Sequence, residues 1–206
     1  HAAKDLRIEE SEPEALGSGQ VEVRIEAGGI CGSDLHYFNH GGFGAIRLKQ
    51  PMILGHEVAG TISALGAGTS GFAIGERVAV SPSKPCGKCE YCLKGQQNQC
   101  LDMRFYGSAM RMPHIHGAFR QRLVAEAFQC HKVADGVSIN EAAFAEPFAV
   151  TLHAVNRAGS LLNKRVLVTG CGPIGALCIL AARAHGAREI IATDVMDGVL
   201  KMASKI

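Results

Sequence analysis

The 206-residue sequence has no long apolar run and no strong excess of charge of either sign. It lacks a stretch of about 18 consecutive apolar residues, which a membrane-spanning helix needs. Its first residues also lack the charged-then-apolar pattern of a secretory signal. Lysine and arginine total 21 against 19 aspartate and glutamate, and no basic block interleaved with aromatics is present. We therefore expect neither a membrane protein nor a nucleic-acid-binding protein.

Cysteine is frequent, and four of the eight cysteines lie close together. Cys86, Cys89, Cys92 and Cys100 follow the spacing C-x2-C-x2-C-x7-C. Tetrahedral zinc takes four deprotonated sulfur ligands at about 2.3 Å, and short C-x2-C steps turn successive thiolates inward. Glycine and proline around the cluster favour a loop. The alternative is disulfides or merely buried thiols. A compact four-thiolate cluster, with no position left for a substrate, predicts a structural zinc site in a lobe of about residues 83–104.

The remaining cysteines bear on the cellular compartment. Cys171 and Cys178 lie among apolar residues, where a reduced cysteine behaves as a small hydrophobe. A metal-binding cluster with reduced thiols elsewhere predicts a cytoplasmic protein. Both ends of the sequence look cut, because no initiator methionine is present and residues 200–206 resemble a helix without a C-cap. We expect a segment of a longer chain.

The composition changes near residue 150. The first part is rich in glycine and in short runs of alternating apolar and polar residues, which are typical of half-buried strands. These runs predict strands at 21–26, 58–62, 77–80, 119–124 and 129–133. The first part is therefore expected to be a small, irregular β domain with functional loops.

The second part has a glycine turn between a strand and a helix. A strand is predicted at 165–169, a helix at 176–185, and a second strand at 190–193 that ends at Asp194. This order is typical of the βαβ unit that binds dinucleotides, in which backbone amides approach the pyrophosphate. Asp194 follows Gly175 by 19 residues, where a carboxylate can accept ribose hydroxyls. An ordinary glycine turn is the alternative. The predicted cofactor site comprises Gly170, Gly172, Pro173, Ile174, Gly175 and Asp194.

Candidate ligands for a second metal ion lie on either side of the cysteine cluster. They are Cys31 in Cys-Gly-Ser-Asp-Leu-His, His56 and Glu57 in Gly-His-Glu, and Glu146 in Ala-Glu-Pro. Thiolate, imidazole and carboxylate all bind zinc, and three protein ligands with one open position make a catalytic site. Each residue also has an ordinary interpretation. Cys31 fits a buried core thiol, Glu57 a hydrogen-bonded loop carboxylate, and Glu146 an acid at a helix N-terminus.

These motifs, in this order, resemble the zinc-dependent medium-chain dehydrogenases over the whole chain. The resemblance implies an α/β plus β fold: a GroES-like domain with a zinc lobe over residues 1–150, followed by the start of a doubly wound Rossmann domain over 151–206. Cys-Gly-Ser-Asp-Leu-His-Tyr and Ala-Glu-Pro resemble the polyol dehydrogenase branch. The runs 51–57, 83–92 and 98–110 resemble the sugar-acid dehydrogenases of that branch.

The resemblance also implies an activity and a set of ligands. It implies oxidation of a secondary alcohol in a polyol or sugar acid with NAD rather than NADP, two zinc ions per chain, and a homodimer or homotetramer. Cys31 and His56 match zinc ligands of the family. Glu57 matches a carboxylate that can approach or bind the same ion. Glu146 holds the place of the second cysteine ligand of many alcohol dehydrogenases, and it also belongs to the implied substrate pocket.

Three further residues receive roles from the resemblance. Ser33 and His36 match a relay that carries the alcohol proton to water, since histidine titrates near neutral pH. Tyr37 matches a substrate-pocket position. Without the family, Ser33 would be interpreted as a turn residue, His36 as a solvent-facing residue and Tyr37 as a half-buried aromatic residue.

Four other positions bear on the implied cofactor and substrate. Val199 stands five residues after Asp194, where the polyol branch commonly has a basic residue, which weakens the ribose contact. Arg104, Arg111 and Arg120 are candidates to bind a substrate carboxylate, or else surface charges; Arg104 is preferred because it lies in the matching run.

Alternative functions stay open at this point. They are a sorbitol, xylitol or threonine dehydrogenase, or a truncated zinc- and nucleotide-binding module without catalysis. His114 and His116, in Met-Pro-His-Ile-His-Gly, are interpreted as part of an exposed loop rather than a metal site.

Overall fold

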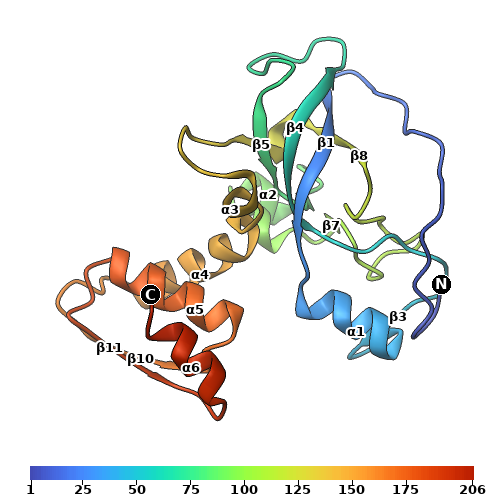
Figure 1. Ribbon diagram of the computed structural model, residues 1–206. Helices are drawn as coiled ribbons and strands as arrows, with labels where there is room; N and C mark the ends of the chain where they lie inside the picture. Colours follow the sequence, from blue (N-terminus) through green and yellow to red (C-terminus); the bar gives the residue numbers. More distant parts are fainter. The chain divides into compact units, whose positions relative to one another are not determined.

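The computed structural model describes residues 1–206, which form two compact units, His1–Phe144 and Ala145–Ile206 (Figure 1). The boundary predicted after residue 150 falls inside helix α4 (Ala145–Ala158), so Glu146 lies in the second unit. None of the helices has the length and apolarity needed to cross a bilayer.

The first unit is built on a five-stranded antiparallel sheet with the strand order β8-β1-β4-β5-β9. Its strands are β1 (Gln20–Gly29), β4 (Glu57–Leu65), β5 (Arg77–Val80), β8 (Arg122–Glu126) and β9 (Cys130–Lys132). The three strands predicted at 21–26, 58–62 and 77–80 are confirmed. The two predicted at 119–124 and 129–133 overlap β8 and β9 but are displaced at their ends.

The core of this unit lies against one face of the sheet. Val21 and Val23 are fully buried and alternate with residues that are partly exposed, as the period of a strand requires. They pack with Ile62, Val78 and Leu123 from neighbouring strands. Burial of each such side chain contributes about 1.5–3 kcal/mol. This packing fixes the register of the sheet, since a one-residue slip would turn the valines outward.

Short elements connect the strands of the first unit. They are α1 (Gly32–His40), β2 (Gly42–Phe43), β3 (Ile46–Arg47), β6 (Ser83–Lys84), α2 (Glu90–Leu93), the 3-10 helix η1 (Gln97–Gln99), β7 (Arg104–Phe105), the 3-10 helix η2 (Ala127–Gln129) and α3 (Ile139–Ala143). Helix α2 lies inside the cysteine lobe, where only a loop was predicted.

The second unit contains one complete βαβ unit. Its elements are α4, β10 (Arg165–Thr169), α5 (Pro173–Ala184), β11 (Glu189–Thr193) and α6 (Asp197–Ala203). Strands β10 and β11 are parallel, with Arg165 opposite Glu189 and Thr169 opposite Thr193. Helix α5 begins at Pro173, earlier than predicted, because proline at the first helical position needs no hydrogen-bond partner for its nitrogen. The predicted βαβ unit is confirmed.

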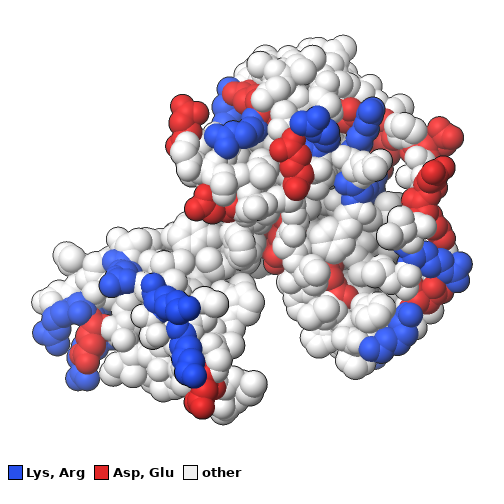
Figure 2. Space-filling model, viewed as in Figure 1, with Lys and Arg blue, Asp and Glu red and all other residues white.

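Charged side chains are mixed on the face of the molecule that Figure 2 shows. Acidic and basic groups are interspersed over the first unit in this view. Ion pairs of this unit include Arg24 with Glu26 and Lys132 with Glu76. That face has no continuous basic surface over the first unit.

Candidate metal and cofactor sites

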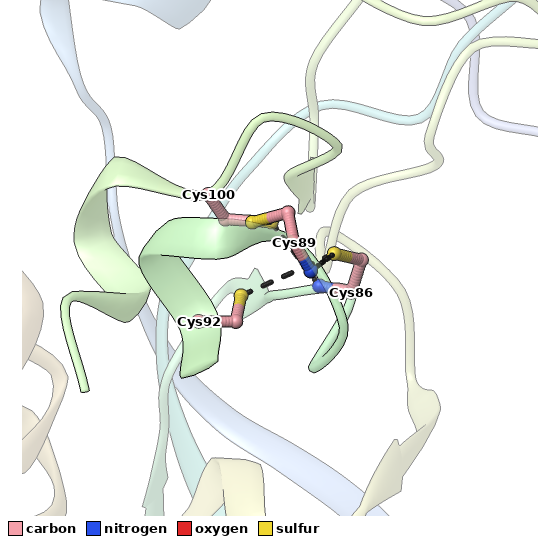
Figure 3. A group of neighbouring side chains, drawn as sticks. All are labelled: Cys86, Cys89, Cys92 and Cys100. Atoms are coloured by element: carbon pink, nitrogen blue, oxygen red, sulfur yellow. Dashed lines mark hydrogen bonds between the residues drawn. The ribbon is translucent and has the colours of Figure 1, made fainter. Parts of the chain in front are cut away.

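The four clustered cysteines converge to form one closed site (Figure 3). Their sulfur atoms all lie within 4.8 Å of one another. The Sγ atoms are 4.0 Å apart both for Cys86 and Cys92 and for Cys89 and Cys100, so no disulfide links them. Four sulfurs bound tetrahedrally at about 2.3 Å from zinc would be about 3.8 Å apart. The arrangement fits a zinc ion held by four thiolates.

Backbone amides donate hydrogen bonds to the sulfur atoms of this site and so favour the thiolate form. The amide of Cys86 donates to Sγ of Cys100 at 3.2 Å, and the amide of Cys89 donates to Sγ of Cys86 at 3.4 Å. The amides of Cys92 and Leu101 lower the pKa of the Cys89 thiol to about 6, whereas burial raises the pKa of Cys92 to about 12. A cation would therefore be attracted to Cys89, whose thiolate form is already favoured. It would also offset the cost of burying a thiolate at Cys92.

A second group of possible ligands consists of Cys31, His56 and Glu57. Their ligand atoms lie within 4.8 Å of one another, although Cys31 precedes α1, His56 directly precedes β4 and Glu57 is the first residue of β4. His56 is 5% exposed and Glu57 8% exposed. A thiol, an imidazole and a carboxylate that converge in this way are the donor set of an open zinc site. We call this group the open site. Its residues fit the predicted metal.

Glu146, the fourth predicted ligand, belongs to a different compact unit from Cys31, His56 and Glu57. It is in the first turn of α4, within the second unit. An acid in a first helical turn is also stabilised by the helix dipole, as its ordinary interpretation requires. Its ligation of the same ion and its place in the substrate pocket therefore stay predictions.

Asp34 is a residue of the open site that the sequence analysis missed. It is 3% exposed, and its carboxylate accepts hydrogen bonds from the amides of Cys31 and Gly55, each at 3.0 Å. It thereby ties the loop before α1 to the loop before β4. The available signal was its position, three residues after Cys31, where an acid can bond back to the amide that precedes a helix.

Burial and charge set the protonation of the open site. Burial lowers the pKa of His56, against an opposite effect of Asp34, and so favours the neutral imidazole that binds metals. Burial raises the pKa of Glu57, as does the neighbouring Asp34 carboxylate, while a hydrogen bond from Cys31 acts in the opposite direction. Two buried carboxylates side by side are costly without a cation. This electrostatic environment also fits a metal ion.

Glycine at position 29 makes room for the Glu57 side chain. Gly29 pairs with Glu57 across β1 and β4. A Cβ atom on Gly29 would lie 2.1 Å from Oε2 of Glu57 and 3.2 Å from its Cβ. The Glu57 carboxylate can occupy its present place only because residue 29 has no side chain.

Helix α1 carries the residues predicted for the relay and the substrate pocket. Ser33 is half-buried and His36 is exposed, with its ring 6.0 Å from that of His40. Tyr37 is 1% exposed, and its hydroxyl accepts a hydrogen bond from the amide of Ala109 at 2.9 Å. The structure gives Tyr37 a packing role, and its contact with substrate stays a prediction.

The glycine turn has the geometry expected of a dinucleotide site. Gly170 has φ of +89°, which favours glycine, and a Cβ on Gly175 would lie 1.8 Å from the carbonyl oxygen of Gly170. Gly172 is the N-cap of α5, and Pro173 and Ile174 begin the helix. The Asp194 carboxylate accepts hydrogen bonds from the amides of Cys171 at 2.7 Å and Met196 at 2.9 Å. These amides lower the pKa of Asp194.

Val199 is partly buried and packs against the hydrophobic cluster of the second unit. This apolar contact gives a physical reason for the missing basic residue there.

The three candidate arginines differ in their partners. Arg111 donates to the carbonyl oxygen of Leu101 at 2.7 Å and pairs with Asp102 at 3.3 Å. Arg120 pairs with Glu14 at 2.6 Å and donates to the carbonyl oxygen of Gly117. Arg104 is exposed, and its side chain makes no hydrogen bond or ion pair. Of the three, only Arg104 has its guanidinium available.

The interpretation of His114 as part of an exposed loop is wrong. His114 is 5% exposed, its Nε2 accepts from the amide of Lys49 at 2.9 Å, and its Nδ1 lies 2.8 Å from the carbonyl oxygen of Arg111. His116 is exposed, yet its Nδ1 accepts from the amide of Ile53 at 3.1 Å. Both rings connect residues 49–53 to this segment, so they support the fold.

Known proteins that are similar to this chain are dehydrogenases. Residues 17–135 match the family described as the alcohol dehydrogenase GroES-like domain. The chain is 45% identical over 184 residues to L-idonate 5-dehydrogenase (NAD(P)(+)) of Escherichia coli K12, covering 89% of this chain and 53% of that protein. It is 38% identical over 206 residues to sorbitol dehydrogenase of Bombyx mori, covering 100% of this chain and 58% of that protein.

Solved structures agree with the sequence relatives. The crystal structure of the E. coli L-idonate 5-dehydrogenase superposes with a TM-score of 0.86 at 45% identity, covering 91% of this chain and 54% of that one. Galactitol-1-phosphate dehydrogenase from E. coli superposes with a TM-score of 0.88 at 34% identity, covering 98% and 56%. The chain spans about half the length of the curated relatives it matches.

Proposed function

We propose, from the premise that this chain belongs to the zinc-dependent medium-chain dehydrogenases with a GroES-like domain, that it is part of an NAD-dependent enzyme that oxidises a secondary alcohol of a sugar acid. The observation that carries the proposal is the convergence of Cys31, His56 and Glu57, separate from a closed four-cysteine site. A simple binding module needs the closed site but has no use for the open one. An enzyme needs an open coordination position for its substrate.

The open site supplies what alcohol oxidation requires. When bound there, zinc would act as a Lewis acid that makes the substrate hydroxyl easier to deprotonate near neutral pH. Cys31 and His56 would hold the ion, with Glu57 and, by resemblance, Glu146 as carboxylate ligands. Ser33 lies two residues after Cys31 at the start of α1 and would take up the hydroxyl proton. The exposed His36 would pass that proton to water.

The second unit would hold the cofactor. The backbone amides at the start of α5 face the position of a pyrophosphate in a Rossmann unit, and Gly172 leaves space for its approach. Asp194 would accept the ribose hydroxyls of NAD. The E. coli relative is named for both NAD and NADP, so the cofactor preference of this chain is a proposal from its own residues.

L-idonate, oxidised at C5 to 5-keto-D-gluconate, is the substrate we propose. The support is 45% identity to L-idonate 5-dehydrogenase and the matching runs 51–57, 83–92 and 98–110. A sugar acid differs from a polyol by its carboxylate, which needs a cationic partner. Arg104 lies in the third matching run and has no internal ion pair. We assign the substrate carboxylate to Arg104.

Initial rates of the complete enzyme on L-idonate, sorbitol, xylitol and L-threonine test this proposal. We expect L-idonate to have the highest kcat/KM. The Arg104→Gln variant should raise KM for L-idonate by about tenfold, the effect of losing about 1.4 kcal/mol of binding, while KM for sorbitol stays unchanged. Lys88→Gln, at an exposed lysine of the same lobe, is the matched control.

A different order of rates would change the assignment. Faster turnover of sorbitol would favour the general polyol dehydrogenases, a candidate supported by 38% identity to a sorbitol dehydrogenase. A protein that binds two zinc ions and NAD but turns over none of the four substrates would contradict the proposed substrate class.

A further inference from the structure

We propose that Phe105 holds the His56 ring in its metal-binding orientation and thereby couples zinc in the cysteine lobe to the metal in the open site. The two rings are in contact, with centroids 5.3 Å apart and planes inclined by 60° in an edge-to-face arrangement. This is a favourable geometry for an aromatic pair. The inference rests on the proposed function only in taking Cys31, His56 and Glu57 as metal ligands.

The His56 ring lacks the usual means of fixing its orientation. A histidine that binds a metal through one nitrogen normally donates its other N–H to a carboxylate, a carbonyl or water. Here Nδ1 of His56 is buried and has no hydrogen-bond partner. The nearest carboxylate oxygen, Oδ1 of Asp34, is 3.9 Å away, which is too long for a hydrogen bond. With the metal bound through Nε2, the ring has no such hydrogen bond and its orientation depends on packing; Phe105 is the aromatic residue in contact with it.

Phe105 is positioned by the cysteine lobe. It is the last residue of β7, which pairs with β6 through Ser83 opposite Phe105 and Lys84 opposite Arg104. In the sequence, β6 directly precedes the four cysteines of the lobe and β7 follows them, so the pairing of these two strands joins the two ends of the lobe. The amide of Tyr106 also donates to the carbonyl oxygen of Pro82 at 3.1 Å. The place of Phe105 thus depends on the lobe being closed.

The backbone next to His56 is held by the same segment. A Cβ atom on Gly107 would lie 3.0 Å from the carbonyl oxygen of Gly55 and 3.2 Å from its nitrogen. Residues 105–107 therefore lie against residues 55–56 along both backbone and side chain. If the lobe loses its zinc and opens, this support is released. Because coupling between two binding events is reciprocal, metal in the open site would also favour zinc in the lobe.

Metal affinity of the complete protein, measured without substrate or cofactor, tests the coupling. Protein that keeps zinc in the lobe is titrated with Co²⁺, and the thiolate-to-cobalt absorption of Cys31 reports binding at the open site. Phe105→Ala should weaken Co²⁺ binding by about tenfold, the lower end of the effect of losing an outer-shell contact. Phe105→Tyr keeps the ring and should bind Co²⁺ as tightly as the wild type. Leu93→Ala, at a lobe residue that is 76% exposed, should change nothing.

A second variant tests whether the lobe acts through Phe105. Cys89→Ser removes one thiolate from the closed site and should weaken Co²⁺ binding at the open site. In the Phe105→Ala background the same change should have little further effect, because the contact that transmits it is already lost. If Cys89→Ser does not fold, the Phe105→Ala and Phe105→Tyr comparison decides alone.

The outcomes separate this inference from the proposed function. Wild-type binding of Co²⁺ in Phe105→Ala, or fully additive effects in the double variant, would overturn the coupling and leave the proposed function untouched. A wild-type protein with no metal at the open site would overturn both.

Discussion

Oδ1 of Asp34 lies 3.9 Å from Nδ1 of His56, and the same carboxylate accepts hydrogen bonds from the amides of Cys31 and Gly55. One buried acid thus fixes the backbone beside two proposed metal ligands that are far apart in the sequence. Asp34 holds the two loops in place through these bonds to the backbone, and it makes no hydrogen bond to the His56 ring. Its negative charge also favours a cation in the open site.

Asp34→Ala is expected to lower the free energy of unfolding by about 3 kcal/mol, because two buried amides lose a charged acceptor. It should also weaken metal binding at the open site by about tenfold or more. Urea unfolding and zinc affinity measure the two effects. Asp135→Ala, at an exposed aspartate, is the control. A change below about 0.5 kcal/mol, which is usual for a surface site, would contradict the role given to Asp34.

Gly29→Ala tests whether Glu57 takes part in metal binding. The new Cβ would meet Oε2 of Glu57 at 2.1 Å, and the carboxylate would have to move. We expect zinc affinity of the open site to fall by about tenfold while the free energy of unfolding changes by less than about 2 kcal/mol. Gly32→Ala is the matched control, since a Cβ there meets nothing within 4 Å. Unchanged zinc affinity in Gly29→Ala would exclude Glu57 as a ligand.

The sequence predicted features that depend on residues close together in the chain. The four cysteines span few residues, the βαβ unit is continuous, and strand β5 coincides with the predicted run 77–80. The expected fold class, a GroES-like domain followed by the start of a Rossmann domain, is confirmed by the structure and by its relatives.

The missed features depend on contacts between distant residues. Asp34 bonds Gly55 across 21 positions, and Tyr37 bonds Ala109 across 72. The bond between His114 and Lys49 spans 65 positions and buries a histidine that resembled a loop residue. The edge-to-face contact of His56 with Phe105 likewise arises only after the lobe folds. No local pattern encodes such pairs, because tertiary packing decides them.

Zinc removal should affect the two metal sites differently. Cys100→Ser, or a chelator strong enough to empty the lobe, is expected to lower the thermal midpoint, since zinc binding there is folding free energy. Turnover of Cys100→Ser should fall as metal binding at the open site weakens, and it should be lost completely as the protein unfolds. Glu146→Gln should leave the thermal midpoint nearly unchanged and reduce turnover. Thermal unfolding followed together with zinc content checks both. Full thermal stability of Cys100→Ser without zinc would contradict a structural role for the lobe.

Two glycines of the turn should respond differently to alanine. A Cβ on Gly175 would lie 1.8 Å from the carbonyl oxygen of Gly170, so Gly175→Ala should destabilise the second unit and abolish NAD binding together. A Cβ on Gly172 meets nothing within 4 Å of the protein, and φ there is −65°. Gly172→Ala should therefore keep the thermal midpoint but weaken NAD binding, because the methyl group occupies the place of the pyrophosphate. Calorimetry with NAD measures this. Wild-type affinity in Gly172→Ala would place the dinucleotide elsewhere.

NAD is expected to be preferred over NADP, because the Asp194 carboxylate accepts ribose hydroxyls and repels a 2′-phosphate. The amides of Cys171 and Met196 lower the pKa of Asp194 below its usual 3.8. A lowered pKa favours the ionised form, which is lost only as the pH falls through that lower value. The preference should therefore be constant between about pH 7.5 and 9, where Asp194 is ionised and a 2′-phosphate, with a second pKa of about 6, is also fully charged. Val199 packs against the hydrophobic cluster of the second unit and offers no positive charge to a phosphate. The ratio of kcat/KM for the two cofactors in the complete enzyme measures the preference.

Asp194→Ala should reduce the preference for NAD, and Asp197→Ala, at an exposed acid on α6, should not. A preference for NADP of about tenfold, equal to about 1.4 kcal/mol of transition-state binding, would overturn the assignment of Asp194.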